Sequence, residues 1–296
     1  MKVAVIGLGT MGAPMAANLL KGGAQVVVHN RNRTREEPLA LQGAARAASP
    51  REAASGADFV LTCVSDTPDA EAVVLDPKDG VIAGVARGAL VIDCSTISPA
   101  GARKIAAKLK EKGVGFVDAP VSGGSEGAQK ATLAIMCGAD GDDFARAKPV
   151  LEKIGKSIVH VGPVGCGQIA KAVNQVVIAG TYQAIAEGLC LAKKAGADPA
   201  RVVAAIENGA AQSWVMANRS KNMRDDRYPL GFRVKLHRKD LAIALETARQ
   251  VALPLPVASY VAAVEDGLIA QSHGDENMSA IARTVRRNAA IADGPM

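Results

Sequence analysis

The first 21 residues carry the pattern that most constrains how this chain can fold. Lys2-Val3-Ala4-Val5-Ile6 is a short apolar run rich in β-branched residues, which is typical of a buried strand. The turn Gly7-Leu8-Gly9-Thr10-Met11-Gly12 follows at once, and the spacing of residues 13–21 predicts a helix. A strand, a G-x-G-x-x-G turn and a helix in this order are the fingerprint of a dinucleotide-binding fold. We therefore predict a Rossmann-type domain at the start of the chain.

Each glycine of this turn has its own physical role. Gly7 would make the tight turn, Gly9 would let the backbone approach a pyrophosphate, and Gly12 would let the helix pack closely on the strand. The helix N-terminus would then face the phosphates. A glycine pattern alone also suits an ordinary tight turn, but its place between strand and helix favours cofactor binding. We predict that residues 7–12 bind the cofactor.

The residues after the second expected strand, 25–29, bear on the choice of cofactor. The fingerprint expects an acidic residue there to bind the adenine ribose, and this chain has Asn30-Arg31-Asn32-Arg33 instead. An acid would repel a 2′-phosphate, whereas Arg31 can bind one through two parallel hydrogen bonds. We predict that Asn30 and Arg31 bind the cofactor and that NADP is preferred over NAD. The alternative is a solvated, arginine-rich loop.

Strand-like and helix-like segments alternate up to residue 161. Strands are expected at 58–64, 89–94 and 115–118, with helical spacing between them, and two further runs at 132–137 and 157–161 complete the sheet. This alternation predicts an α/β fold with a doubly wound parallel sheet. In such sheets ligands bind beyond the carboxyl ends of the strands. We therefore expect ligand contacts in Val64-Ser65-Asp66, Ser95-Thr96 and residues 119–124.

The texture changes after Gly162, where strand-like runs cease and helical spacing fills the rest of the chain. We predict a dinucleotide-binding domain at 1–163 and an all-helical domain at 164–296. Helices are expected at about 167–195, 199–208, 212–224, 236–252, 256–271 and 276–290.

The first of these helices combines an apolar sequence with a lysine near its start. Past Gly167 it contains no proline, and Ala, Val, Ile and Leu fall on nearly every face, which predicts a buried helix. Lys171 and Asn174 are three residues apart and project from one face. Burial and the positive end of the helix macrodipole both disfavour the ammonium form of Lys171, so we expect a lowered pKa that suits acid–base catalysis. The alternative is a lysine whose stem packs on the protein while its amine stays in water.

Composition narrows the classes of partner. The formal net charge of +6 suits anionic ligands such as phosphates and carboxylates. The chain has no Lys/Arg run with interleaved aromatic residues, so we expect no nucleic-acid partner. Asn174, Gln175, Gln183 and Glu187 interrupt the apolar run of the long helix, which therefore reads as a core helix and not as a membrane span.

Cysteines and histidines indicate the compartment and the absence of a metal site. The five cysteines are widely spaced without a C-x-x-C pair, which is typical of a reduced set. The four histidines have no cysteine or acid at metal-ligand spacing, so we expect no metal. No signal peptide precedes the first strand. We therefore expect a cytoplasmic protein.

Four segments, taken together, carry a family resemblance that spans the chain. They are residues 7–15, Asp118–Gly124, Gly165-x-Gly167-x-x-x-Lys171-x-x-Asn174 and Lys239-Asp240-Leu241. Their order and spacing resemble the β-hydroxyacid dehydrogenase family, which includes 3-hydroxyisobutyrate dehydrogenases, tartronate semialdehyde reductases and glyoxylate/succinic semialdehyde reductases. The resemblance implies a Rossmann domain and an all-helical domain joined by a long interdomain helix, and a homodimer or homotetramer.

The resemblance also implies a catalytic residue and a substrate loop. Lys171 matches the family's catalytic lysine, and Ser122, Gly123 and Gly124 match the loop that holds the substrate carboxylate. The residue chemistry agrees, because a hydroxyl followed by flexible glycine N–H groups makes a good carboxylate site. A plain glycine turn is the alternative.

Further roles follow from the same resemblance. Asn174 matches an amide that orients the substrate, Thr96 a cofactor contact near the nicotinamide ribose, and Lys239 a lysine that reaches the cofactor from the second domain. Some members place their amide four residues after the lysine, where this chain has Gln175, so we include Gln175 among the expected substrate contacts. The Lys-x-x-Asn-Gln arrangement is more similar to the tartronate semialdehyde reductase branch. The segment 209–214, by contrast, is similar to other hydroxyisobutyrate-dehydrogenase-like enzymes, so the substrate stays open.

The implied activity is hydride transfer between NADP(H) and a small carboxylate-bearing substrate. This substrate would be a β-hydroxy acid or its semialdehyde, of the 3-hydroxyisobutyrate, tartronate semialdehyde/glycerate, succinic semialdehyde or glyoxylate class. One alternative is a decarboxylating enzyme like the 6-phosphogluconate dehydrogenases. Such an enzyme needs a cluster of cations to bind the substrate phosphate. The one nearby cluster consists of Arg219, Lys221 and Arg224, which is typical of a solvated helix face. The other is a non-catalytic NADP-binding protein, which would have no need of Lys171 and Ser122.

Overall fold

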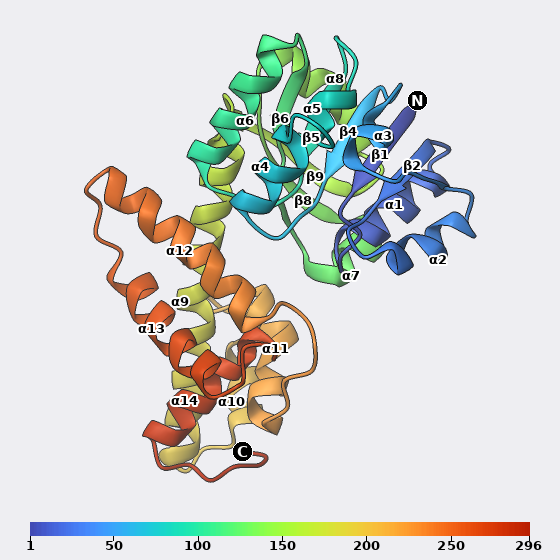
Figure 1. The fold of residues 1–296 in the computed structure, drawn as a ribbon. Coiled ribbons are helices and arrows are strands. Elements are labelled where there is room, and N and C mark those ends of the chain that lie inside the picture. The colour runs from blue at the N-terminus through green and yellow to red at the C-terminus, as the bar shows by residue number, and fades with distance from the viewer. The chain divides into compact units, whose positions relative to one another are not determined.

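The computed structural model describes residues 1–296, which form two compact units, Met1–Lys171 and Ala172–Met296 (Figure 1). The division falls inside the longest helix, α9 (Cys166–Lys194), and not before it at 163/164. The reason lies in the first residues of α9, which are hydrogen-bonded to the sheet of the first unit, as described below.

The first unit alternates strands and helices. Its strands are β1 Lys2–Ile6, β2 Gln25–His29, β3 Ala45–Arg46, β4 Phe59–Thr62, β5 Leu90–Asp93, β6 Gly115–Asp118, β7 Val121–Ser122, β8 Leu133–Gly138 and β9 Gly155–Gly162. Its helices are α1 Gly12–Lys21, α2 Glu37–Ala40, α3 Pro50–Ala54, α4 Thr67–Leu75, α5 Val81–Gly84, α6 Pro99–Glu111, α7 Gly124–Gln129 and α8 Gly141–Leu151, together with the 3₁₀ helix η1 Arg33–Glu36.

The strands form one sheet in the order β3-β2-β1-β4-β5-β6-β8-β7, with β9 paired to β8. The central strands β1, β2, β4, β5 and β6 pair in parallel. β8 runs antiparallel to β6 and β7, so the sheet is mainly parallel with a mixed edge. The predicted doubly wound sheet is confirmed. Because the strand order reverses between β1 and β4, the carboxyl ends of these two strands flank the switch point where such sheets bind ligands.

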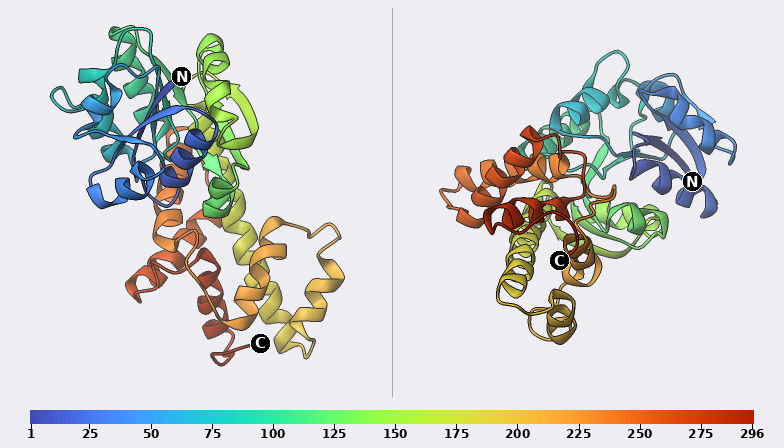
Figure 2. Two further views of the ribbon diagram at one scale, coloured as in Figure 1. Left: turned by 90° about the vertical axis from the view of Figure 1, so that its right-hand side faces the viewer. Right: turned by 90° about the horizontal axis from the view of Figure 1, so that it is seen from below.

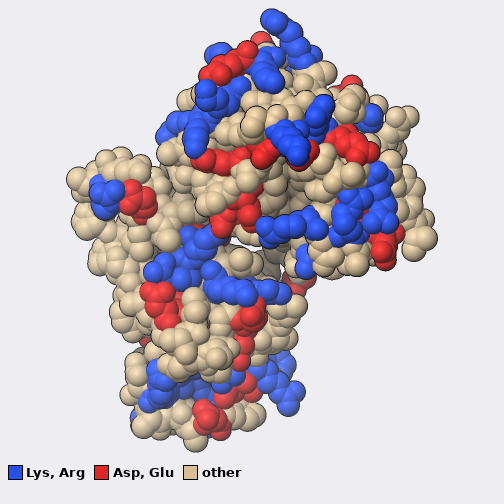
Figure 3. Space-filling model, viewed as in Figure 1, with Lys and Arg blue, Asp and Glu red and all other residues tan.

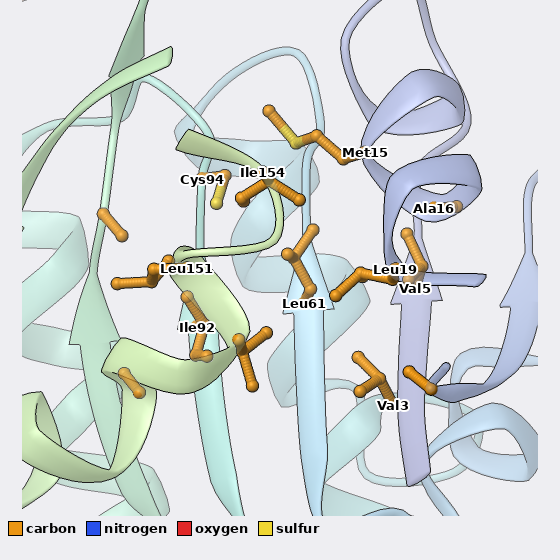
Figure 4. Close-up of a cluster of buried hydrophobic side chains, with 14 of the residues drawn as sticks. Val3, Val5, Met15, Ala16, Leu19, Leu61, Ile92, Cys94, Leu151 and Ile154 are labelled. Atoms are coloured by element: carbon orange, nitrogen blue, oxygen red, sulfur yellow. The ribbon is translucent and has the colours of Figure 1, made fainter. Parts of the chain in front are cut away.

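Helices cover both faces of this sheet, and β1 shows how the sequence directs them. Val3 and Val5 pack into a core with α1 and α8, which includes Leu19 and Leu151 (Figure 4). Residues 4 and 6 alternate with them and pack into the opposite core, with α3, α4 and α6. A strand that is apolar at every position is therefore buried on both sides, as expected for a parallel sheet.

The second unit is all-helical, as predicted (Figure 2). After α9 it contains α10 Pro199–Ile206, α11 Trp214–Asp225, α12 Val234–Gln250, α13 Pro256–Ala270, the 3₁₀ helix η2 Met278–Ala280 and α14 Ile281–Asn288. The expected helix 276–290 is thus shorter, because the Asn277 side chain accepts a hydrogen bond from the N–H of Ser279 and starts η2 instead. The core includes Ala179 and Ala186 of α9 and Leu241 of α12, all fully buried.

The sequence predicts that α9 is buried on every face, but one side of the helix is exposed. Val173 and Val177 are more than half exposed, and Leu191 is 70% exposed.

None of the helices is long and apolar enough to span a bilayer. On the face drawn in Figure 3, Lys and Arg side chains are interspersed with Asp and Glu side chains on both units.

Candidate active site

The glycine turn after β1 has the geometry that its sequence predicts. Gly7 has a φ of +93°, a value that favours glycine. A Cβ on Gly12 would lie 1.9 Å from the carbonyl oxygen of Gly7, so only glycine allows α1 to start this close to β1. A Cβ on Gly9, in contrast, would meet nothing nearer than a guanidinium nitrogen of Arg35 at 3.9 Å. The backbone at Gly9 is therefore open to a ligand, and this cradle fits a dinucleotide pyrophosphate.

Asn30, at the end of β2, holds the turn in shape. Its Oδ1 accepts a hydrogen bond from the N–H of Leu8 at 2.8 Å, and its Nδ2 donates to the carbonyl of Asn32 at 2.8 Å. Its own N–H donates to the buried carboxylate of Glu36 at 3.0 Å. The predicted cofactor residue Asn30 therefore also shapes the loop.

Three arginines follow β2, and the structure separates their positions. Arg33 donates to the carbonyl of Ala47 at 2.6 Å and pairs with buried Glu36 at 3.0 Å, so its guanidinium is engaged within the fold. The Arg31 side chain is 91% exposed and lies 3.6 Å from a carboxylate oxygen of Asp69. Arg35 reaches back to the glycine turn, where its Nη1 lies 3.4 Å from the carbonyl of Leu8. Arg35 was not among the residues predicted from the sequence, although the Arg-x-Arg-x-Arg spacing after β2 was a usable signal.

The loops after β4 and β5 meet, as parallel neighbours should. The N–H of Val64 donates to Ser95 Oγ at 2.8 Å, so the Ser95 side chain ties the two loops together. Ser65 next to Val64 is exposed, and Thr96 next to Ser95 is half-buried. The predicted residues Val64, Ser65 and Thr96 thus occupy adjacent loops at the carboxyl edge of the sheet.

The serine–glycine loop follows β6 and leads into α7. Ser122 is half-buried, and Gly123 and Gly124 are exposed. Gly123 has a φ of +132° and Gly124 a φ of +61°, two consecutive values that favour glycine. The pair lets the chain turn sharply at an exposed position, which fits the predicted carboxylate loop.

Asp118, the last residue of β6, anchors the start of α9. Its Oδ1 accepts from the N–H of Gly165 at 2.7 Å, and its Oδ2 accepts from the N–H of Gln168 at 2.9 Å. A Cβ on Gly167 would lie 2.4 Å from the carbonyl of Met136, so glycine is needed for this close approach. Burial raises the pKa of Asp118 to about 7, against the smaller, opposing effect of these two hydrogen bonds.

Gln168 forms a second anchor of the same helix. It is buried, its Nε2 donates to the carbonyl of Ser95 at 2.8 Å, and its Oε1 accepts from the N–H of Ile97 at 3.1 Å. Asp118 and Gln168 together attach the first turn of α9 to the ends of β5 and β6. The sequence analysis assigned neither residue a role.

This anchored turn places Lys171. The residue is only 6% exposed, and its Nζ donates to the carbonyl of Val121 at 2.9 Å. Val121 directly precedes Ser122, so the buried amine lies beside the peptide that leads into the serine–glycine loop. A buried amine at this position can exchange a proton with a molecule bound at the serine–glycine loop.

The remaining predicted residues lie in the second unit, where they form one hydrogen-bonded chain. Asn174 Nδ2 donates to Gln175 Oε1 at 2.8 Å, and Gln175 Nε2 donates to Asp240 Oδ2 at 2.5 Å. The other oxygen of Asp240 lies 2.9 Å from the Nζ of Lys239. Asn174, Gln175 and Lys239 are therefore linked through Asp240, which the sequence analysis noted only as part of a motif.

The structure shows no cluster of three or more His, Cys, Asp or Glu side chains that could hold a metal ion. All five cysteines are free thiols. Burial raises the pKa of Cys137 to about 12 and that of Cys94 well above its usual value, so neither is a ready nucleophile.

Two family models together match most of the chain. Residues 2–162 match a family model described as the NAD-binding domain of 6-phosphogluconate dehydrogenase. Residues 165–285 match one described as NAD-binding of NADP-dependent 3-hydroxyisobutyrate dehydrogenase.

Individual relatives cover most of the chain. It is 40% identical to 2-hydroxy-3-oxopropionate reductase of Escherichia coli strain K12, over 86% of this chain and 87% of that protein. It is 38% identical to 3-hydroxyisobutyrate dehydrogenase of Pseudomonas aeruginosa, over 86% of this chain and 88% of that protein. The structure of 3-hydroxyisobutyrate dehydrogenase of Mycobacterium tuberculosis with L-serine superimposes with a TM-score of 0.87 at 34% identity, over 96% of this chain and 99% of that one. Matches of this extent and identity show that the chain belongs to the β-hydroxyacid dehydrogenase family of nicotinamide-dependent enzymes.

Proposed function

We propose that the protein is an NADP-preferring enzyme that interconverts a small β-hydroxy acid and its semialdehyde. The observation that carries the proposal is the buried Lys171 amine, which donates to the carbonyl of Val121 at 2.9 Å beside the Ser122 loop. In this proposal an acid–base group and a carboxylate site lie next to each other in the first unit. Substrates of the 3-hydroxyisobutyrate, tartronate semialdehyde/glycerate, succinic semialdehyde and glyoxylate class fit this arrangement. They carry a carboxylate for the loop and a carbonyl or hydroxyl oxygen for Lys171.

The nicotinamide ring supplies or accepts the hydride when the cofactor is bound. Lys171 supplies a proton to the substrate oxygen during reduction and removes the hydroxyl proton during oxidation. The Ser122 hydroxyl and the N–H groups of Gly123 and Gly124 hold the substrate carboxylate. Asn174, three residues after Lys171 on the same helix, orients the substrate.

Several residues would hold the cofactor. The glycine turn would receive the pyrophosphate, Thr96 would lie near the nicotinamide ribose, and Lys239 would also contact the cofactor. Arg31 binds the 2′-phosphate, and we add Arg35, whose guanidinium already lies at the turn. The absence of an acid after β2 and the presence of these two guanidinium groups support a preference for NADP over NAD.

The free thiols support a reducing compartment, and we infer a cytoplasmic protein. The exposed valines of α9 support self-association into a homodimer or homotetramer.

A substrate panel with a lysine variant tests the proposal. NADPH oxidation is measured with glyoxylate, succinic semialdehyde, tartronate semialdehyde and methylmalonate semialdehyde. The reverse assay with NADP⁺ includes 6-phosphogluconate, which would be consumed if the decarboxylating alternative held. We expect turnover with at least one semialdehyde or with glyoxylate, and Lys171→Ala should reduce it by about 10²- to 10⁴-fold, the range for a lost general acid.

The variant should still fold and bind NADPH, because it removes a costly buried amine from a site outside the glycine turn. Lys171→Arg should fail as well, since a guanidinium does not release its proton at working pH. Turnover of Lys171→Ala above about a tenth of wild type, with chemistry rate-limiting, would show that another residue supplies the proton.

A further inference from the structure

We propose that Gln175 is a positioning residue that fixes the orientation of the Asn174 amide, and that Asp240 and His237 hold Gln175 for this purpose. The inference rests on the proposed function, in which Asn174 orients the substrate. It gives Gln175 a different role from the direct substrate contact that the sequence suggests.

Gln175 is engaged at both ends of its amide and is fully buried. Nε2 donates to Asp240 Oδ2 at 2.5 Å, and Oε1 accepts from Asn174 Nδ2 at 2.8 Å. A side chain with no exposed surface and with both polar ends bonded inside the protein offers nothing to a substrate. Its hydrogen bonds act on its neighbours instead.

The direction of these bonds is set by Asp240. A carboxylate only accepts hydrogen bonds, and its other oxygen, Oδ1, lies 2.9 Å from the Nζ of Lys239. Gln175 must therefore turn its NH₂ group toward Asp240 and its oxygen toward Asn174. Asn174 must in turn present an N–H to Gln175. Its own carbonyl oxygen then points away from Gln175, where it can accept a hydrogen bond from the hydroxyl of a hydroxy acid.

Helix α12, which carries Asp240, also holds the main chain of Gln175. His237 Nε2 lies 3.2 Å from the carbonyl oxygen of Gln175, and because a carbonyl can only accept, Nε2 donates. On the other side of the ring, Nδ1 lies 2.6 Å from Glu265 Oε1, and both residues are fully buried. His237 and Asp240 are three residues apart and share one face of α12. They fix the carbonyl and the amide of Gln175 together, so Gln175 has one available position.

A double-mutant cycle tests the role of Gln175. Gln175→Met keeps an unbranched side chain of similar length and removes both amide hydrogen bonds. We expect kcat/KM for the best panel substrate to fall about tenfold, the effect of roughly one ordinary hydrogen bond. The Kd for NADPH should stay unchanged. In the Asn174→Ala background, the same substitution should have no further effect on kcat/KM, because the amide that it positions is gone.

Gln183→Met is the matched control. Gln183 lies on the same helix, is buried, and donates to a carboxylate, that of Glu187, at 2.6 Å. It has no bond to Asn174, so its loss should change kcat/KM by less than about twofold even if thermal stability falls as much. An equal loss of kcat/KM in Gln183→Met would show that Gln175 acts through stability alone.

Gln175→Glu serves if the methionine variant does not fold. A protonated glutamic acid can donate to Asp240 and accept from Asn174, as glutamine does, whereas the carboxylate cannot donate. Its neighbours Asp240, Lys239, His237 and Glu265 are the titratable groups of this cluster. We expect near-wild-type kcat/KM at acid pH and a loss of activity on deprotonation, in a step that the wild type lacks.

Three further results would overturn the inference. Equal effects of Gln175→Met in the wild-type and Asn174→Ala backgrounds would mean that Gln175 does not act through Asn174. Unchanged kcat/KM in Gln175→Met, with turnover abolished by Lys171→Ala, would refute this role and leave the proposed function intact. An enzyme without hydride transfer to any panel substrate would refute both.

Discussion

In the mechanism that we propose, Ser122 and Lys171 act on the same bound molecule, yet their loss should be distinguishable in the kinetics. Ser122→Ala removes one charge-assisted hydrogen bond to the substrate carboxylate, worth about 1.5–3 kcal/mol, so kcat/KM should fall about ten- to a hundredfold. The Kd for NADPH, measured by fluorescence titration, should hardly change. A variant that loses NADPH binding but handles substrate normally would place this loop at the cofactor instead.

Substitutions of the arginines after β2 should differ in how they change NADPH binding relative to NADH binding. Arg31→Ala and Arg35→Ala should each weaken NADPH binding more than NADH binding, because only NADPH carries the 2′-phosphate. Arg33→Ala is the control: its guanidinium bonds Ala47 and Glu36, so we expect lower thermal stability without a change in the NADPH/NADH ratio. Equal losses for both cofactors in Arg31→Ala and Arg35→Ala would refute the NADP preference.

Residues whose role follows from local pattern could be predicted from the sequence. The turn geometry of Gly7 and Gly12 was predicted from their spacing after a strand, and the burial of Lys171 from its place near the start of an apolar helix. The catalytic role of Lys171 stays a prediction. Asp118, Gln168 and Arg35 could not be assigned in the same way. Their partners lie 27 to 73 residues away, and such pairings arise only once the sheet is formed.

Most of the helices and strands could be predicted from the spacing of the hydrophobic residues and from the turn residues between them. The predicted strands 2–6, 25–29 and 115–118 have the observed bounds, because each is a short, mostly apolar run next to turn residues. The two-residue strands β3 and β7 were missed, since two residues carry no measurable period. The mixed edge at β8 was also missed, because strand direction depends on the connection and not on the strand's own residues.

The attachment of α9 to β6 should give the protein a recognisable pH dependence. Burial raises the pKa of Asp118 from 3.8 to about 7, so the folded state holds a proton that the unfolded state releases between these values. The stability that Asp118 contributes is therefore greatest below pH 3.8 and is lost as the pH rises through about 7. Asp118→Asn has no titrating group and should remove this part of the slope. Urea unfolding of both proteins across this pH range measures it, and parallel slopes would contradict the assignment.

For the whole molecule, the composition and the exposed face of α9 point to association between copies. Val173 and Val177 are 58% and 60% exposed on adjacent turns of one face, where single chains usually keep polar residues. We expect a dimer or tetramer by light scattering at micromolar concentration. Val177→Asp should shift it toward the monomer.

Leu41 supplies the control for that experiment. It is 91% exposed in the first unit, away from α9 in the chain, so Leu41→Asp should leave the molar mass unchanged. A monomeric wild type, or equal dissociation by both variants, would exclude this face as the interface.

The substrate itself could not be predicted from sequence, because one lysine, one serine–glycine loop and one amide serve several small acids equally well.

The two hydrogen bonds that Gly165 and Gln168, at the start of α9, donate to Asp118 determine where the chain can be divided. A Rossmann fragment that ended at residue 163, where strand-like sequence stops, would lack the N–H groups of Gly165 and Gln168. It would leave the Asp118 carboxylate buried without its donors and lose the amide that ties β5 to the helix. A fragment that ended after Lys171 would keep both bonds. Anyone grafting this cofactor-binding unit onto another partner should therefore carry the first six residues of α9 with it, as a part of the sheet's own framework.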